Sequence, residues 1–198
     1  MDQKYLEHFI EELHGFAARG FPVREVRQYL KGNLLPLNEL QPYVFVAVEQ
    51  YTRNLIYKSS EFELMVVVWS AGQAAPIHGH EGEKCWARVE SGELLFTNYR
   101  EHSAGDSFRL ETISQQFGGP GYLDGPADIH KVENTSTQPA ITLHLYSRPF
   151  EACDIYGIEN HRKLRKRLGY FSKFGQRVPD GEAFSGNAIP TMSNEDAI

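Results

Sequence analysis

The sequence predicts a mainly β domain, an antiparallel sandwich or small barrel, with helices at its N-terminal end. From about residue 42, short runs of β-branched and aromatic residues alternate with turns rich in Gly, Asn, Ser and Pro, and no helical pattern separates them. Before that point, apolar residues recur at helical spacing. The 198 residues are enough for one domain with a buried core. We expect N-terminal helices over 1–40, the β-barrel over 41–175 and a surface tail over 176–198.

The N-terminal region is predicted to form two helices, over about residues 2–18 and 23–31. Gly20 ends the first helix, and Pro22 prevents it from continuing. The first helix also carries two histidines, which we interpret as surface or packing residues without a catalytic role. Its apolar face is formed by Leu6, Phe9, Ile10, Leu13 and Phe16.

Predicted strands dominate the rest of the chain. The pattern weakens after Pro149. A basic cluster at 162–167 is interpreted as a solvent-exposed face, and the residues from about 178 onward as a loosely held surface tail. The runs with the composition of short strands bounded by turns are 44–48, 51–57, 62–69, 85–89, 92–99 and 141–146.

Composition limits the classes of function. The net charge of -6 argues against nucleic acid and anionic membranes as main partners. No apolar run approaches the roughly 20 residues of a membrane span, and the residues that follow Met1 do not open a signal peptide. The two cysteines, Cys85 and Cys153, offer no disulfide framework. We expect a cytoplasmic location and a monomeric protein.

Histidines in strand-like sequence are the candidate metal ligands. His78 and His80 are separated by one residue of an extended segment, so both imidazoles point the same way and can bind one metal ion. His130 lies in a later β segment, and we predict that these three histidines hold a metal. Two alternatives stay open on the residues alone. His144 could replace His130, and Cys85 could bind the metal, as thiolates do in zinc and blue-copper sites.

A centre of three imidazoles differs chemically from one that includes a carboxylate. Neutral ligands leave a divalent metal with its full positive charge, which favours an anionic ligand supplied by the substrate, such as a thiolate. With zinc, the same ligands would form a hydrolytic centre that activates water. The side chains near the metal therefore determine whether such a centre carries out oxygen chemistry or hydrolysis.

Two of the predicted strands each carry polar side chains on one of their faces. Alternation puts Thr142, His144 and Tyr146 together, and this face looks either into the barrel, where it would hydrogen-bond a metal-bound ligand, or into water. Arg53 shares its face with Tyr51. An inward arginine needs an anion, because an unpaired buried charge is costly, and a substrate carboxylate would meet that need. The alternative is a surface arginine.

Residue spacing around the histidines resembles the two motifs of the cupin superfamily. Cys85 stands where the first motif usually has glutamate. Together with segments 51–55, 64–69, 143–147 and 172–175, these motifs make the region from about 51 to 175 resemble the cysteine dioxygenases, the thiol dioxygenase branch of the cupins. The first motif consists of Gly72, His78, His80, Cys85 and Gly92, and the second matches in part through His130 and Asn134.

The resemblance implies a cupin-type jelly-roll barrel and an enzyme of cysteine catabolism. It implies that Fe(II) is held by His78, His80 and His130. L-Cysteine would bind the iron through its thiolate and amine, while Arg53 takes its carboxylate and Tyr51 lies nearby. Both atoms of O2 would end on the sulfur and give 3-sulfinoalanine.

The resemblance also assigns catalytic side chains. His144 would orient the Tyr146 hydroxyl, and Thr142 would support this contact as part of the substrate site. Cys85 could form a thioether cross-link with Tyr146, as in the mammalian members. Arg53 favours L-cysteine, because the related 3-mercaptopropionate dioxygenases carry glutamine at that position. The alternatives are a 3-mercaptopropionate dioxygenase and, more remotely, a non-catalytic ligand-binding cupin or a zinc-dependent hydrolase or isomerase.

Overall fold

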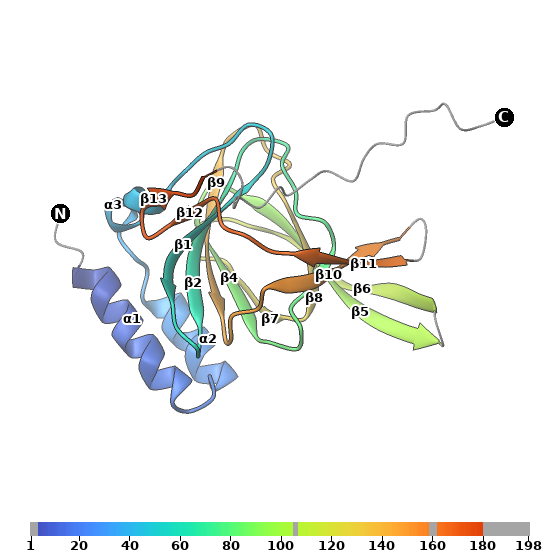
Figure 1. Cartoon of the computed structure of the whole chain (residues 1–198), viewed down its shortest axis with the longest axis horizontal. Helices are drawn as coiled ribbons and strands as arrows, with labels where there is room; N and C mark the ends of the chain where they lie inside the picture. Colours follow the sequence, from blue (N-terminus) through green and yellow to red (C-terminus); the bar gives the residue numbers. More distant parts are fainter. Residues whose placement is uncertain (1–3, 105–106, 159–161, 180–198) are drawn as a thin grey trace.

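The structure is a computed structural model, and it describes residues 4–104, 107–158 and 162–179. In this part of the chain two β-sheets face each other, and the N-terminal helices cover the outer face of one of them (Figure 1). The sheets form the jelly roll expected of a cupin, as two facing sheets rather than one closed barrel. Within the described ranges, no helix combines the length and the apolar character of a membrane span.

The N-terminal helices match the predicted ones closely. Helix α1 covers Lys4–Ala17 and helix α2 covers Val23–Gly32. Two short helices that were not predicted follow, α3 (Leu37–Leu40) and the 3₁₀ helix η1 (Gln41–Tyr43). The buried face of α1 packs in one apolar cluster with the outer side chains of the neighbouring sheet, and it consists of Leu6, Phe9, Leu13 and Phe16.

The first sheet has seven strands in the order β13-β12-β1-β2-β9-β4-β7. In the central strand β2, Leu64 and Val66 face the helices, whereas Met65 and Val67 face the second sheet. Both faces of β2 are therefore apolar, which explains its nearly unbroken apolar sequence. The strands are β1 (Thr52–Lys58), β2 (Glu63–Trp69), β4 (Cys85–Ser91), β7 (Leu123–Ala127), β9 (Ala140–Tyr146), β12 (Ser172–Lys173) and β13 (Gln176–Arg177).

The second sheet has six strands in the order β11-β10-β3-β8-β5-β6. Its inner side chains, among them Phe96 and Val132, pack against the inner face of the first sheet and form the core between the sheets. This core surrounds the site described below. The strands are β3 (His78–Gly79), β5 (Leu94–Ala104), β6 (Ser107–Gly118), β8 (Ile129–Glu133), β10 (Ala152–Gly157) and β11 (Arg162–Arg167).

The strand predicted over 44–48 is wrong. This segment forms no strand, and Val46 and Val48 are exposed. Side chains of Ser70 and Gln73 hold it in place by donating hydrogen bonds to the carbonyl of Ala47, each at 3.0 Å. Its β-branched residues have the composition of a strand but no partner strand to pair with, and composition alone does not reveal the partner.

The edge strands β6 and β11 of the second sheet were not predicted, for a related reason. Strand β6 is mostly exposed and polar, and its apolar alternation is limited to Phe108 and Leu110, which is too short to signal a half-buried strand. The basic cluster at 162–167 is the exposed edge strand β11, which confirms its predicted exposure. Strand pairing continues to Arg177, into the region expected to be the surface tail. Residues 180–198 of that tail lie outside the described residues.

The two histidines of α1 do not belong to the cluster of candidate metal ligands. His8 is exposed and lies 3.7 Å from Glu11. His14 packs on the ring of Phe62, and its Nε2 atom shares a 2.9 Å hydrogen bond with the Tyr57 hydroxyl. Their contacts are those of surface and packing residues.

Candidate active site

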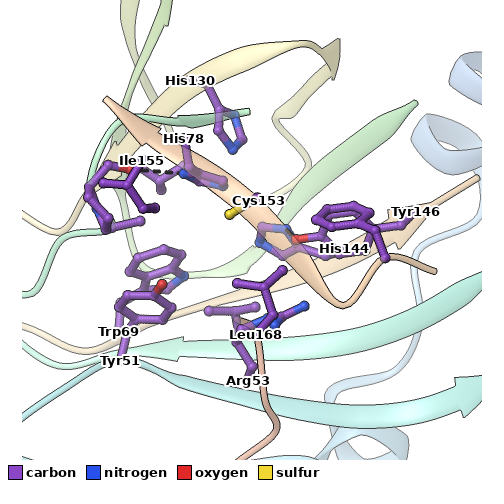
Figure 2. Close-up of a pocket in the computed structure, with 15 residues that line it drawn as sticks. Tyr51, Arg53, Trp69, His78, His130, His144, Tyr146, Cys153, Ile155 and Leu168 are labelled. Carbon is purple, nitrogen blue, oxygen red and sulfur yellow. Dashed lines mark hydrogen bonds between the residues drawn. The ribbon is translucent and has the colours of Figure 1, made fainter. Parts of the chain in front are cut away.

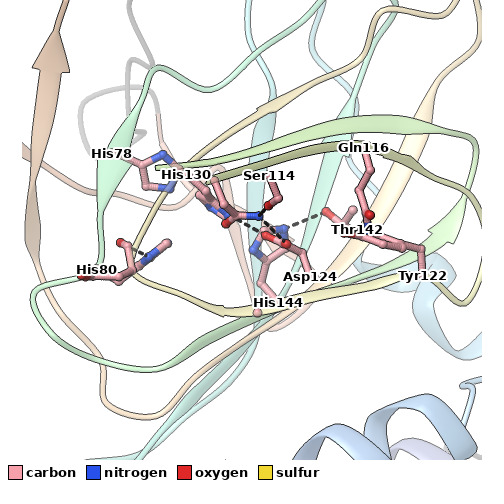
Figure 3. A network of polar contacts seen from close by, with 12 residues as sticks. His78, His80, Ser114, Gln116, Tyr122, Asp124, His130, Thr142 and His144 are labelled. Carbon is pink, nitrogen blue, oxygen red and sulfur yellow. Dashed lines mark hydrogen bonds and ion pairs between the residues drawn. The ribbon is translucent and has the colours of Figure 1, made fainter. Parts of the chain in front are cut away.

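Three histidines converge between the two sheets. His78 on β3 lies directly opposite His130 on β8, and His80 follows β3 by one residue. The ring centroids are between 4.7 and 5.0 Å apart. One ligand nitrogen from each ring lies within 4.8 Å of the other two, and the rings face one another in Figure 3. This arrangement can hold one metal ion.

The second nitrogen of each ring has an oxygen partner that sets the ring orientation. The Nδ1 atom of His78 lies 2.9 Å from the Pro76 carbonyl, and that of His80 lies 2.8 Å from the Asp128 carbonyl. The Nδ1 atom of His130 lies 3.0 Å from the Asp124 carboxylate. Because these oxygens only accept, each Nδ1 carries the proton and each Nε2 keeps a free lone pair.

The free nitrogens fit a metal. The Nε2 atom of His80 is buried and has no hydrogen-bond partner among the described residues. Burial, and next the neighbouring His130, lower the pKa of His78 to about 3, and the same two causes hold the pKa of His80 well below its usual value. Buried neutral imidazoles with inward lone pairs are the ligand form of histidine.

Position distinguishes the three candidates for the third ligand. Among the described residues, His78, His80 and His130 form the one cluster of potential ligands with metal-binding spacing. His144 lies on β9 of the first sheet, and Cys85 lies on β4 of the same sheet; neither joins the cluster. The cluster contains no carboxylate.

A cavity opens beside the cluster, between the two sheets (Figure 2). His78 and His130 line it from the second sheet, whereas Arg53 and His144 line it from the first. The remaining wall is largely apolar and aromatic. It includes Tyr51, Trp69, Tyr146, Phe150, Cys153, Ile155 and Leu168.

Arg53 points into the protein and is buried. Its guanidinium donates a 3.2 Å hydrogen bond to the Gly169 carbonyl and lies 3.5 Å from the Glu63 carboxylate. Glu63 is also close to Lys58, at 3.6 Å, and accepts a 2.5 Å hydrogen bond from the Tyr170 hydroxyl. Two cations thus share one buried carboxylate, and Arg53 keeps the capacity to bind a further anion in the cavity.

A chain of hydrogen bonds crosses the inner face of the first sheet. Trp69 Nε1 lies 2.9 Å from the Thr142 hydroxyl, which lies 2.8 Å from His144 Nε2. His144 Nδ1 lies 3.3 Å from the Tyr146 hydroxyl. All four side chains are buried, and Figure 3 shows the contact between Thr142 and His144.

The donors and acceptors in this series of hydrogen bonds determine its direction. The Trp69 indole can only donate, so the Thr142 oxygen accepts from it. The Thr142 proton then goes to His144 Nε2 at 2.8 Å, because its other acceptor, the Val67 carbonyl, is 3.4 Å away, which is long for a hydroxyl. His144 therefore carries its proton on Nδ1 and donates to Tyr146, and the Tyr146 proton stays available to another partner.

Thr142 and Cys85 lie behind the cavity wall rather than in it. We expected Thr142 to belong to the substrate site, but it does not line the cavity and instead supports His144. Cys85 is fully buried and pairs with Tyr146 across neighbouring strands. Burial raises the pKa of the Cys85 thiol far above its usual value, although a hydrogen bond from Tyr146 opposes this effect.

Comparison with known proteins agrees with this geometry. The model of the family "Cysteine dioxygenase type I" matches residues 6–159. The chain belongs to this family. Cysteine dioxygenase type 1 of Rattus norvegicus is 30% identical over 179 residues, covering 88% of this chain and 90% of the relative. The corresponding protein of Homo sapiens is 29% identical over 185 residues, covering 91% of this chain and 92% of the relative.

Two solved structures can be superposed on part of the chain. The TT1209 protein from Thermus thermophilus has a TM-score of 0.45 and 22% identity, and the superposition covers 55% of this chain and 93% of that one. A Klebsiella pneumoniae protein with a double-stranded β-helix domain has a TM-score of 0.46 and 14% identity, with 65% and 87% covered.

Membership of the cysteine dioxygenase family confirms the predicted resemblance, the enzyme class and, with the three-histidine cluster, a bound metal. Sequence analysis missed three side chains of this site, Glu63, Trp69 and Asp124. Glu63 was detectable, because a carboxylate at the start of a buried apolar strand requires a buried partner. Asp124 gave no signal, since its role depends on two sheets meeting.

Proposed function

We propose that this chain holds Fe(II) on His78, His80 and His130 and oxidises L-cysteine with O2 to 3-sulfinoalanine. The observation that carries the proposal is the cavity itself, in which Arg53 on one sheet faces the histidine cluster on the other. Such a cavity suits a small substrate with an anionic group at each end. L-Cysteine has a thiolate for the metal and a carboxylate for the arginine.

The metal would supply the positive centre that accepts the thiolate and allows O2 to react with the sulfur. The chain contributes three neutral imidazoles and no negative ligand, so the substrate has to bring the negative charge. Apolar and aromatic side chains line most of the rest of the cavity and would exclude water once the substrate fills it. Exclusion of water strengthens the electrostatic contacts of the bound substrate.

Arg53 would bind the substrate carboxylate through its planar guanidinium. Its position is set by Glu63 and the Gly169 carbonyl, so the guanidinium is held before substrate arrives. Tyr51 lies beside it and stacks on Trp69 with ring centroids 4.8 Å apart. The tyrosine thereby completes the wall of the cavity around the substrate.

Tyr146 would act as a hydrogen-bond donor toward the substrate. Burial raises its pKa well above the usual value, with the nearby Cys85 as the next cause, so the hydroxyl stays protonated. Because His144 already donates to the tyrosine oxygen, the hydroxyl proton does not point at His144 and can turn from Cys85 to a substrate in the cavity. His144 and Thr142 would act by orienting this group.

Cys85 and Tyr146 would also be joined by a thioether. The sulfur would bond to a carbon of the tyrosine ring, and the S–H and C–H hydrogens would be lost as two protons and two electrons, with O2 as the oxidant. The register of β4 and β9 places the two residues opposite each other. Both belong to the buried core between the sheets.

The main alternative substrate is 3-mercaptopropionate, which lacks the amine. A non-catalytic cupin or a zinc-dependent hydrolase or isomerase remains a remote alternative. One experiment separates them: metal analysis of protein purified without added metal, followed by O2 uptake with each thiol. Iron with higher kcat/KM for L-cysteine supports the proposal. Higher kcat/KM for 3-mercaptopropionate, zinc without O2 uptake, or no metal would each overturn it.

The cellular setting is part of the same proposal. We infer a cytoplasmic, monomeric enzyme whose partners are L-cysteine and O2, without nucleic acid or membrane partners. The net charge of -6 supports the absence of polyanionic partners. Size-exclusion chromatography with light scattering tests the monomer directly.

A further inference from the structure

We propose that Asp124 is a positioning residue for the metal centre, and that it makes His130 the strongest electron donor of the three histidines. This inference rests on the proposed metal site. It concerns a carboxylate that contacts a ligand rather than the metal, in a centre whose ligands are all neutral.

The three histidines differ in the partner of Nδ1. His78 and His80 each face a neutral main-chain carbonyl, at 2.9 and 2.8 Å. His130 faces the Asp124 carboxylate at 3.0 Å. A carboxylate pulls the Nδ1 proton more strongly than a carbonyl does, and this makes the opposite nitrogen a better donor to a metal. The centre is therefore asymmetric in electron donation although its three ligands are the same residue type.

Asp124 is held in place for this contact. One carboxylate oxygen accepts from His130, and the other accepts a 2.9 Å hydrogen bond from the Asn98 amide. Asn98 and His130 lie opposite each other on β5 and β8, whereas Asp124 is on β7 of the other sheet, opposite Ala87. The carboxylate thus links the two sheets at the metal site, and Figure 3 shows it beside His130.

The environment leaves Asp124 few other functions. Its side chain is 5% exposed, and His130 is 1% exposed. A buried carboxylate is costly unless it is paired, and here its partners are the His130 imidazole, the Asn98 amide and the Gly125 main chain. A neutral residue would serve packing at lower cost. The position is best explained by what the charge does for His130.

The substitution Asp124→Asn isolates this effect. The asparagine oxygen can still accept from His130, while its NH2 group faces Asn98, whose amide can turn its oxygen to accept. His130 would then have a neutral partner like those of His78 and His80. Asp128→Asn is the matched control. It removes the same charge four positions along the chain, yet Asp128 contacts His80 only through its main-chain carbonyl, which the substitution keeps.

The measurement is the dissociation constant of the apoprotein for Zn(II) and for Fe(II) under argon, by competition with a chromophoric chelator. We expect Asp124→Asn to bind each metal roughly 10-fold or more weakly than wild type, as for other partners of metal-bound histidines. Asp128→Asn should bind as wild type. Equal affinity of wild type and Asp124→Asn, or equal losses in both variants, would overturn the proposal.

A spectroscopic readout separates electron donation from loss of structure. In the Co(II)-substituted protein, each Nδ1 proton gives its own paramagnetically shifted NMR signal. Asp124→Asn should displace one of these signals and leave the other two in place. Displacement of all three, or of none, contradicts the assignment.

Two further variants keep the outcomes distinct. If apo Asp124→Asn fails to fold, Asn98→Ala removes the support of the carboxylate but not its charge, and it should weaken metal binding with little change in thermal stability; unchanged affinity would overturn the proposal. His130→Ala tests the metal site itself. If the wild type and His130→Ala bind metal alike, the proposed metal site fails, whatever Asp124 does.

Discussion

Glu63 lies 3.5 Å from Arg53 at the edge of the cavity, and the two side chains are 0% and 7% exposed. Lys58 lies 3.6 Å from the same carboxylate, so the group contains two cations and one anion. A substrate carboxylate would bring the second anion and balance the charges. The arrangement orients Arg53 without neutralising the whole group, and this makes the arginine a suitable anchor for an anionic substrate.

The first prediction concerns this anchor. Arg53→Ala should raise KM for L-cysteine about 30-fold, because a charge-assisted bond to a carboxylate contributes about 2 kcal/mol. Arg53→Gln should shift the ratio of kcat/KM values toward 3-mercaptopropionate, which lacks the amine. Arg100→Ala serves as control, since Arg100 is exposed. An unchanged KM in Arg53→Ala, measured by O2 uptake, would show that the carboxylate binds elsewhere.

The second prediction concerns the third metal ligand. His130→Ala should lose bound iron and all O2 uptake, because two imidazoles remain in the cluster. His144→Ala should keep its iron and lose only part of its activity, since His144 contacts Thr142 and Tyr146 instead. Iron is measured per protein chain by atomic emission. Iron retained in His130→Ala and lost in His144→Ala would show that His144, and not His130, is the third metal ligand.

The metal cluster was predictable because two of its histidines are close in the sequence and the third belongs to a recognisable motif. His78 and His80 follow from two positions of one extended segment, and His130 follows from a motif that the family resemblance supplies. The direction of Arg53 was left open by alternation, which distinguishes the two faces of a strand but not which face is inside. Only the packing of helices on the outer face, through Leu64 and Val66, determines it.

Contacts that depend on how the strands are arranged could not be predicted from the sequence. Asp124 is six residues from His130 in the chain, and it contacts His130 because β7 and β8 belong to different sheets that meet at the site. Thr142 was expected at the substrate, yet Trp69, a long way off in the sequence, occupies its other side and directs it to His144. Strand composition identifies faces and turns, whereas these contacts depend on which strands become neighbours.

The third prediction concerns the thioether. Wild-type protein incubated with Fe(II), O2 and L-cysteine should lose two hydrogen atoms of mass, and its tryptic digest should contain the Cys85 and Tyr146 peptides joined. Cys85→Ser should show neither change, while Cys153→Ser should behave as wild type. Mass spectrometry detects both species. A joined peptide in Cys85→Ser, or none in wild type after turnover, would exclude this cross-link.

The fourth prediction concerns the two motif glycines. Gly92 has φ +78°, and a Cβ there would lie 2.7 Å from both the Ala140 side chain and the Pro139 carbonyl. Gly72 has φ +76°, but a Cβ there would meet nothing within 4 Å. Gly72→Ala should cost about 1 kcal/mol in free energy of unfolding, from the left-handed backbone alone. Gly92→Ala should cost about 3 kcal/mol or more, because steric overlap adds to that. Urea unfolding measures both, and equal costs would contradict the steric argument.

The fifth prediction concerns the direction of the hydrogen-bond chain. Trp69→Phe removes the indole donor that helps to orient the Thr142 hydroxyl, so this hydroxyl can turn its proton away from His144, and His144 no longer has to carry its proton toward Tyr146. We expect kcat to fall roughly 3- to 10-fold, which corresponds to the loss of one hydrogen bond of about 1 kcal/mol. Iron content and KM for L-cysteine should be nearly unchanged. The phenyl ring keeps an aromatic partner for Tyr51.

Trp86→Phe is the matched control for that experiment. Trp86 is equally buried, but its indole nitrogen has no hydrogen-bond partner among the described residues, and its ring packs on the helix side of the sheet. Both substitutions remove the same atoms from an apolar core, so both should lower thermal stability. Only Trp69→Phe should also lower kcat. If both variants lose kcat equally, the effect comes from packing, and the indole of Trp69 does not set the orientation of His144.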